Sequence, residues 1–330
     1  MVTAEQAYIR TELERRHQRL QGALKSHLAD RGLSALLAEV DAALSRIENG
    51  TYGLCEACHE PIERDRLLAD PLVRFCLDDL TGDERRALEQ DMALAAKIQR
   101  GLLPPRHASF SGWHVAYCYE PARVISGDYC DFFESNGDLL FLCGDVSGKG
   151  VAASMLMSHL HGIFRSLGDA ELPLRKMVEA ANRIFLESTL AEQFATLVVG
   201  RASPDGAVQF VSAGHLPVLH LSGESTNMQG STGLPLGMFS NAQYSTHNLS
   251  LQPGSALLIY TDGLTEAQDF GGKEFGIERL TNFVVARTDT DPETLLADCL
   301  TNLKEFTAGT QQADDMTMLV IRRTSGTPSV

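Results

Sequence analysis

Aspartates stand beside apolar, strand-like runs at four places in the C-terminal two thirds of this chain. The positions are Asp128, Asp145, Asp262 and the pair Asp314-Asp315. Carboxylates at the ends of neighbouring strands can meet at one rim of a sheet, where they repel one another unless divalent cations neutralise them. An all-oxygen site of this kind suits Mg²⁺ or Mn²⁺. One Asp before Gly, as at Asp262, is typical of a turn, but four positions together favour a metal centre.

The pattern of apolar residues after Pro105 predicts an α+β fold. Short apolar runs predict strands over 113–120, 129–134, 139–145, 194–200, 208–212, 218–221, 256–260 and 316–321. Helical periodicity predicts helices over 151–166, 174–188, 276–286 and 292–306. Two helices follow the first strands and two precede the last. This grouping favours a layered sandwich over a regularly alternating parallel sheet.

The residues before Pro105 predict three smaller pieces. Two apolar stripes at helical spacing, broken at Arg31-Gly32, predict a helical hairpin. A loop-like, cysteine-bearing segment follows, and the helical pattern then resumes as a linker helix. The expected domains are therefore 1–50, 51–82, 83–107 and 108–325, with a tail over 326–330.

Three of the seven cysteines lie close together in the sequence. Cys55 and Cys58 form one pair, and Cys76 and Asp79 follow with the same internal spacing. Two such pairs can close a tetrahedral zinc site, which stabilises a segment too short for a core of its own. His59 competes for the fourth position with a less suitable spacing. The alternative is a set of buried thiols without metal.

The stretch IENGTYGLCEACHEPIERDRLLADPLVRFCLDDL resembles the DksA/TraR-type zinc finger. The resemblance implies a helical hairpin with a zinc finger at its base, acting on RNA polymerase through an acidic hairpin tip. This chain has Asp79 in place of the last cysteine, and its tip at 28–32 lacks the paired acidic motif. We therefore expect a scaffold or sensor module borrowed from that family.

A second resemblance covers the chain from about residue 87 to 322. It rests on eight motifs in order: KIQRGLLPP, SGDYCDFF, GDVSGKGVAASMLM, FATLVVG, SAGHLPVLHL, GLPLGMF, LLIYTDGLTEAQD and ADDMTMLVIRR. This region resembles the bacterial PPM-type protein serine/threonine phosphatases of the SpoIIE/RsbU group. The resemblance implies an αββα sandwich, in which two stacked antiparallel sheets are flanked by helices.

The same resemblance implies a centre of two Mn²⁺ or Mg²⁺ ions. Asp145 would bridge both ions, and the Val146 carbonyl would bind one of them. The remaining ligands would come from Asp128, Asp262, Asp314 and Asp315. Many relatives have Asn at the position of Asp315, so the choice between Asp314 and Asp315 as the direct ligand stays open. Asp128, Asp145, Asp262 and Asp314 are the expected catalytic residues.

A two-metal centre implies hydrolysis by a metal-activated water, without a covalent enzyme intermediate. The substrate implied by the resemblance is phosphoserine or phosphothreonine on a regulatory protein, an anti-sigma-factor antagonist. His215 is either a general acid or a residue that fixes its loop. Arg123 either contacts the substrate phosphate or lies on the surface. The competing function is a non-catalytic, RNA polymerase-binding protein that keeps the phosphatase fold as a docking surface.

Charge limits the partners that this chain can bind. Its 28 Lys and Arg against 43 Asp and Glu give a formal charge of −15, which opposes binding to nucleic acid or to an anionic membrane. No long apolar window and no signal-like start are apparent, so we expect a cytoplasmic protein. Leu88, Met92, Ala95 and Leu102 approximate a coiled-coil seam on the linker helix, which predicts a homodimer regulated through the N-terminal module.

Overall fold

The computed structural model describes residues 4–26, 31–77, 82–170, 172–189, 193–223 and 225–324. The chain divides into two compact units, Met1–Met92 and Ala93–Val330. The first unit carries the hairpin and the cysteine cluster. The second carries both sheets.

The hairpin of the first unit consists of α1 (Ala4–Ser26) and α2 (Arg31–Glu48). Leu13 of α1 and Val40 of α2 are buried in one apolar cluster, so the two stripes cover each other. The predicted hairpin is therefore confirmed. Because α2 begins at Arg31, the Arg31-Gly32 pair lies in the helix and not at the break. The rest of the predicted tip, 28–30, and the tail at 326–330 lie outside the described residues.

Two antiparallel sheets make up the second unit. The larger sheet has the order β1 (His107–Phe110), β2 (Trp113–Glu120), β11 (Met316–Arg323), β10 (Ala256–Tyr260), β7 (Val218–Ser222) and β8 (Ser225–Gln229). The smaller has the order β3 (Tyr129–Ser135), β4 (Asp138–Val146), β5 (Ala195–Ala202), β6 (Ala207–Ala213) and β9 (His247–Ser250). Alternate side chains of both sheets, such as Phe141 and Ile259, form the core between them.

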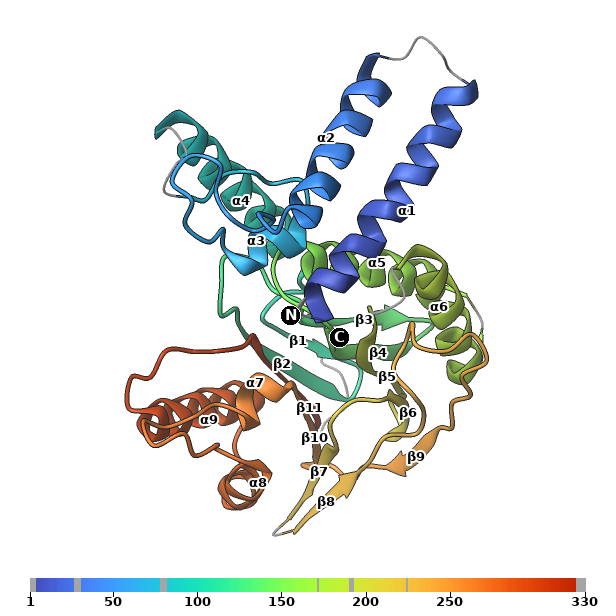
Figure 1. The fold of residues 1–330 in the computed structure, drawn as a ribbon. Helices are drawn as coiled ribbons and strands as arrows, with labels where there is room; N and C mark the ends of the chain where they lie inside the picture. The colour runs from blue at the N-terminus through green and yellow to red at the C-terminus, as the bar shows by residue number, and fades with distance from the viewer. Residues whose placement is uncertain are drawn as a thin grey trace. The chain divides into compact units, whose positions relative to one another are not determined.

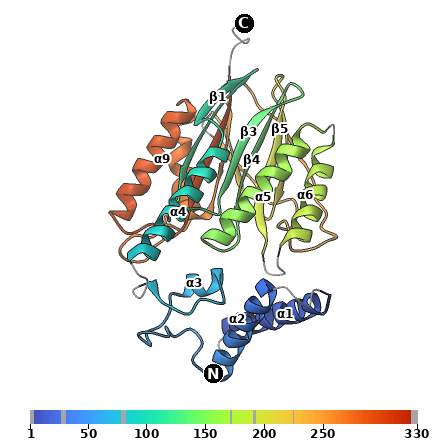
Figure 2. The same ribbon diagram turned by 90° about the horizontal axis from the view of Figure 1, so that it is seen from above.

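Helices cover the outer face of each sheet (Figures 1 and 2). Apolar residues of α5 (Val151–Gly168) and α6 (Leu174–Ser188) share a cluster with residues of β3 and β4. Those of α8 (Ile277–Val285) and α9 (Pro292–Thr307) share another with residues of β10 and β11. The order of layers is thus helix, sheet, sheet, helix, which confirms the predicted αββα sandwich.

Four short elements, besides a single helical turn after β10, have no counterpart in the sequence prediction. They are α3 (Arg64–Ala69), β1, β8 and β9. The side chains of these three strands are exposed or intermediate, and none is buried. The strands therefore lack the apolar runs that are typical of the central strands. They are edge or near-edge strands, where little apolar surface is buried.

The linker helix α4 (Gly82–Leu102) has a polar residue on its buried side. Within the second unit its buried residues are Ala96 and the polar Gln99, whereas Leu94 and Ile98 are 56% and 59% exposed. A polar residue on the buried side requires hydrogen-bond partners, and these partners connect the helix to the site described next.

Candidate metal centre

The predicted carboxylates lie at the ends of central strands in both sheets. Asp128 directly precedes β3, and Asp145 is the next-to-last residue of β4. Asp262 opens the one-turn helix α7 (Asp262–Thr265) directly after β10, and Asp314-Asp315 directly precedes β11. Because β3 pairs with β4 and β10 pairs with β11, both antiparallel, these ends lie at one edge of each sheet.

The pKa shifts of these acids show that they lie close together. Burial, followed by the negative charges of Asp262, Asp314 and Asp315, raises the pKa of Asp145 to about 7. Burial followed by the charge of Asp314 also raises the pKa of Asp262. Carboxylates that raise one another's pKa in this way form a cation site, because a bound cation stabilises their charged forms.

Asp128 is the most buried of the acids, with 1% of its surface exposed. Its Oδ2 accepts hydrogen bonds from the hydroxyls of Thr261 at 2.9 Å and Thr317 at 2.6 Å. Its Oδ1 is buried and has no hydrogen-bond partner among the described residues. Burial, followed by the charge of Asp145, raises the pKa of Asp128 well above its ordinary value. A buried oxygen without a donor is a vacant acceptor, which a cation or its bound water can fill.

Asp314 and Asp315 have different surroundings. Both Asp315 oxygens are occupied by backbone donors, Ala122 N at 2.8 Å and Gly127 N at 2.9 Å. Asp314 accepts from the Asp315 N–H at 2.9 Å and pairs with Lys149 Nζ at 2.8 Å. The side chain of Asp314 is 43% exposed. Asp315 therefore anchors the loop before β3, and Asp314 is the more accessible carboxylate.

Two glycines keep the backbone close around this site. A Cβ on Gly263 would lie 2.0 Å from the Asp315 carbonyl oxygen, a separation that no side chain can adopt. A Cβ on Gly127 would lie 3.0 Å from the Val146 carbonyl oxygen and 3.3 Å from Asp145 Oδ1. The Val146 carbonyl and the Asp145 carboxylate thus both lie close to the Gly127 backbone. A residue without a side chain allows this close approach.

The donor set fits a hard divalent cation. It consists of carboxylates and one backbone carbonyl, all oxygen, with mutual repulsion among the acids and a vacant oxygen on Asp128. Mn²⁺ and Mg²⁺ prefer such ligands. Asp128, Asp145, Asp262, Asp314 and the Val146 carbonyl are the groups that could hold them.

Gln99 of α4 fastens the loop that carries Asp128. Its Nε2 donates to the Ser126 carbonyl at 2.7 Å and to Ser154 Oγ at 3.1 Å, while its Oε1 accepts from the Ser126 N–H at 3.1 Å. The Ser126 hydroxyl in turn accepts from the Asp128 N–H at 3.0 Å. Sequence reasoning missed Gln99, Ser126, Thr261 and Thr317, although each lies within or beside a recognised motif.

His215 lies buried at the end of the loop after β6, where its Nδ1 is 2.9 Å from Thr196 Oγ1. Burial lowers the pKa of His215 to about 4, so the ring is neutral at physiological pH. This environment favours the loop-fixing role. Arg123 lies exposed in the loop between β2 and β3, on the same segment as Asp128. Burial raises the pKa of Cys130 and Cys143 well above the ordinary thiol value, as expected for packing residues.

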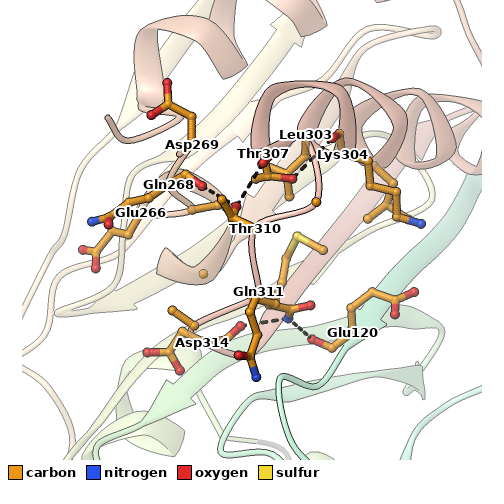
Figure 3. A pocket seen from close by; sticks show the side chains of 17 residues that line it. Glu120, Glu266, Gln268, Asp269, Leu303, Lys304, Thr307, Thr310, Gln311 and Asp314 are labelled. Atoms are coloured by element: carbon orange, nitrogen blue, oxygen red, sulfur yellow. Dashed lines mark hydrogen bonds between the residues drawn. The ribbon is translucent and has the colours of Figure 1, made fainter. Parts of the chain in front are cut away.

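A cavity of about 570 Å³ opens beside the rim. Asp314 and Glu120 lie on one side of it, and Glu266 and Lys304 lie on the other (Figure 3). Leu300, Leu303 and Met316 supply its apolar part. The charged side chains of the lining are mainly acidic, so the cavity wall does not by itself attract a phosphate group.

The cysteine cluster lies in the first unit. The Sγ atoms of Cys55, Cys58 and Cys76 lie within 4.8 Å of one another, and those of Cys58 and Cys76 are 3.6 Å apart. Two thiolates on one tetrahedral zinc are about 3.8 Å apart, given a Zn–S bond of about 2.3 Å. The three sulfurs therefore fit zinc. Asp79, the predicted fourth ligand, lies outside the described residues.

Comparison with known proteins assigns a family to each of two parts of the chain. Residues 135–324 match the family model for stage II sporulation protein E (SpoIIE), and residues 50–78 match that for the prokaryotic dksA/traR C4-type zinc finger. Protein IcfG from Synechocystis sp. is 30% identical over 261 residues, which is 69% of this chain and 40% of IcfG. The phosphoserine phosphatase RsbU from Bacillus subtilis is 24% identical over 244 residues, 72% of each chain.

Among solved structures, the RsbU and RsbW domains of Rv1364c from Mycobacterium tuberculosis superpose with a TM-score of 0.60 at 28% identity. The match covers 68% of this chain and 63% of that one. The sandwich and its acidic rim therefore define a phosphatase domain of the PPM class. Within that class the chain belongs to the SpoIIE family, with a DksA/TraR-type zinc finger ahead of the phosphatase domain. None of the helices in the described part of the chain is long and apolar enough to cross a bilayer.

Proposed function

We propose that this chain is a metal-dependent phosphatase that removes phosphate from serine or threonine of a regulatory protein. The observation that carries the proposal is the gathering of Asp128, Asp262 and Asp314 around Asp145, together with a buried Asp128 Oδ1 that lacks a donor among the described residues. Bound Mn²⁺ or Mg²⁺ would supply charge neutralisation and a water of lowered pKa. The chain supplies the ligands and their placement.

The residues have separate roles in this proposal. Asp145 and the Val146 carbonyl would hold one cation, and Asp145, Asp262 and Asp314 would hold the other. Asp128 would bind a cation, directly or through water, with its Oδ1. Thr261 and Thr317 both donate to the other oxygen, Oδ2. Asp315 positions the loop, because both of its oxygens accept backbone hydrogen bonds, and we assign the more exposed Asp314 as the direct ligand. Lys149 lies beside Asp314 and offsets part of the negative charge at the entrance.

A regulatory phosphoprotein is the substrate class that the relatives support. RsbU is named a phosphoserine phosphatase, and this chain aligns with 72% of it. The SpoIIE/RsbU resemblance points to an anti-sigma-factor antagonist as the substrate. The acidic cavity beside the rim is suited to the neutral or basic residues that flank the phosphoserine, while the phosphate itself needs the cations.

The N-terminal module regulates this activity in our proposal. Leu94 and Ile98 are exposed on α4, the helix whose Gln99 holds the Asp128 loop. Pairing of two chains along this face would bury them and place a homodimer contact beside the loop. Light scattering should show a dimer for the wild type and a monomer for Ile98→Glu. A wild-type monomer at micromolar concentration would remove the dimer from the proposal.

Zinc in the cysteine cluster completes the module. We assign Cys55, Cys58, Cys76 and Asp79 as its ligands, with two Mn²⁺ or Mg²⁺ ions in the phosphatase domain. Cys58→Ser should lower the zinc content of the purified protein and leave its manganese content unchanged. Equal zinc in both proteins would contradict the assignment.

Hydrolysis of p-nitrophenyl phosphate and of a phosphoserine peptide with Mn²⁺ tests the activity. Asp145→Asn and Asp262→Asn should each lower the rate by at least about 100-fold, since a lost ligand weakens the cation site. Asp138→Asn is the matched control, because Asp138 lies at the opposite end of β4 from Asp145. An inactive wild type with manganese bound would favour the alternative, a non-catalytic RNA polymerase-binding protein.

A further inference from the structure

A second cluster of metal-binding side chains lies in the phosphatase domain, away from the carboxylates. The donor atoms of His107 in β1, His114 in β2 and Glu293 in the first turn of α9 lie within 4.8 Å of one another. His114 pairs with Arg322, whereas the far end of β2, Glu120, pairs with Met316 next to Asp315. Six residues of strand separate the two ends, about 20 Å. The cluster is thus distinct from the carboxylate rim.

The spacing of the donor atoms matches a bound zinc ion. His114 Nε2 lies 3.1 Å and His107 Nδ1 lies 3.5 Å from the same Glu293 oxygen, Oε1. Ligands with bonds of about 2.0–2.1 Å to a tetrahedral zinc are about 3.3 Å apart. Two of the three donor separations are therefore close to those around a zinc ion, and the third lies within 4.8 Å.

The fold sets this arrangement through the β1–β2 hairpin. His107 pairs with Ala116, and Ser109 pairs with His114, so the two histidines are diagonal neighbours on one face. That face also carries Ala116, which packs in the same cluster as the apolar residues of α9. The start of α9 then brings Glu293 against the imidazoles. A bound ion would join the hairpin to the helix.

Capping of α9 does not account for the position of Glu293. The N-cap of α9 is Asp291, whose carboxylate accepts from the Thr294 N–H at 2.9 Å. The second oxygen of Glu293, Oε2, is buried without a hydrogen-bond partner among the described residues. An ion pair with a protonated histidine would use only Oε1, whereas a cation bound by both oxygens would satisfy Oε2 as well.

We propose that His107, His114 and Glu293 form a further metal site, selective for Zn²⁺ over Mn²⁺ and Mg²⁺. Two imidazoles and one carboxylate suit Zn²⁺, while the all-oxygen rim suits the harder ions. Three protein ligands leave a fourth position for water or another ligand. The proposal does not depend on phosphatase activity.

Zinc binding to the full chain tests this site. The protein is dialysed against Zn²⁺ with excess Mg²⁺, which occupies the carboxylates and does not compete for imidazole, and bound zinc is counted by mass spectrometry. Wild type should hold one zinc more per chain than the double variant His107→Ala/His114→Ala. His247→Ala, which removes a half-buried histidine from β9 of the other sheet, should equal wild type.

Cobalt separates this site from the cysteine cluster. Co²⁺ bound by thiolates gives a near-ultraviolet charge-transfer band, which the histidine variants should retain, while the visible absorption of nitrogen- and oxygen-bound Co²⁺ should fall. Glu293→Gln keeps the shape of the side chain and should weaken this zinc site by at least about tenfold. Unchanged zinc content in the double variant, or unchanged affinity in folded Glu293→Gln, would overturn the proposal.

Discussion

Removing Mn²⁺ and Mg²⁺ should make the stability of this protein fall as the pH rises. Burial and three neighbouring acids raise the pKa of Asp145 to about 7 in the folded chain, against about 3.9 in an unfolded one. Between these values the folded state binds more protons than the unfolded state, so the free energy of unfolding decreases with pH. The stability is fully present below about pH 4 and is lost as the pH passes through about 7.

The size of the effect follows from the shift. Each pKa unit corresponds to about 1.4 kcal/mol, so a shift of about three units gives a loss of about 4 kcal/mol for Asp145 in the metal-free protein. Bound Mn²⁺ stabilises the ionised carboxylates and removes this loss. Manganese affinity should accordingly rise with pH until Asp145 is fully ionised.

Urea unfolding at several pH values between about 5 and 8 measures this dependence. Mn²⁺ and Mg²⁺ are removed by passing the buffers over resin, without chelator in the sample, so that zinc stays on the cysteines. Asp145→Asn is the control because its amide cannot ionise, and the titrating histidines are common to both proteins. If metal-free wild type and Asp145→Asn lose stability with pH at the same rate, the reasoning is refuted.

Three further substitutions probe the surroundings of the site. Gln99→Ala should destabilise the protein by about 1–3 kcal/mol in urea unfolding, since it leaves the Ser126 N–H and carbonyl unpaired, and should lower kcat; a change in stability without a change in rate would separate α4 from the site. Thr317→Val removes one hydrogen-bond donor to Asp128, which favours the protonated form of this carboxyl over the form that binds Mn²⁺. The manganese affinity at neutral pH, measured by calorimetry, should therefore fall about tenfold. Equal affinity would show that Asp128 is not a ligand. Gly263→Ala should cost about 1–3 kcal/mol, because its Cβ would meet the Asp315 carbonyl; a thermal unfolding midpoint equal to that of wild type would show that the loop can move aside.

The central strands and the acidic rim could be predicted because buried strands have apolar runs that are visible in the local sequence. Strands such as β2 and β10 bury alternate or successive residues, so their bounds, Trp113–Glu120 and Ala256–Tyr260, follow from apolar runs alone. Aspartates next to such runs must lie at strand ends, and strand ends meet at rims. The exposed strands β1 and β9 leave no such mark, since little of their surface is apolar and buried.

Residues that act through tertiary contacts could not be predicted in the same way. Gln99 lies 27 positions from Ser126 and 55 from Ser154, and its buried position appears only when α4 is packed. The periodicity of that helix predicts a seam through Leu88, Met92, Ala95 and Leu102, and Leu88 is 40% exposed in the structure. A helical pattern identifies the apolar side, but it does not show whether a polar residue on another side finds partners.

The packing of Gln99 explains how a signal could reach the carboxylates without altering either sheet. Its amide forms three hydrogen bonds, two of them to the backbone of Ser126, whose hydroxyl holds the Asp128 N–H. The third reaches Ser154 in the first turn of α5. Rotation of α4 by a fraction of a turn would break these bonds together, because they all depend on one side chain. The Asp128 loop would then lose its anchor at Ser126, while the Asp315 hydrogen bonds and the buried strands stayed in place. In the regulation proposed above, α4 would therefore be the element through which the N-terminal module acts on the cation site.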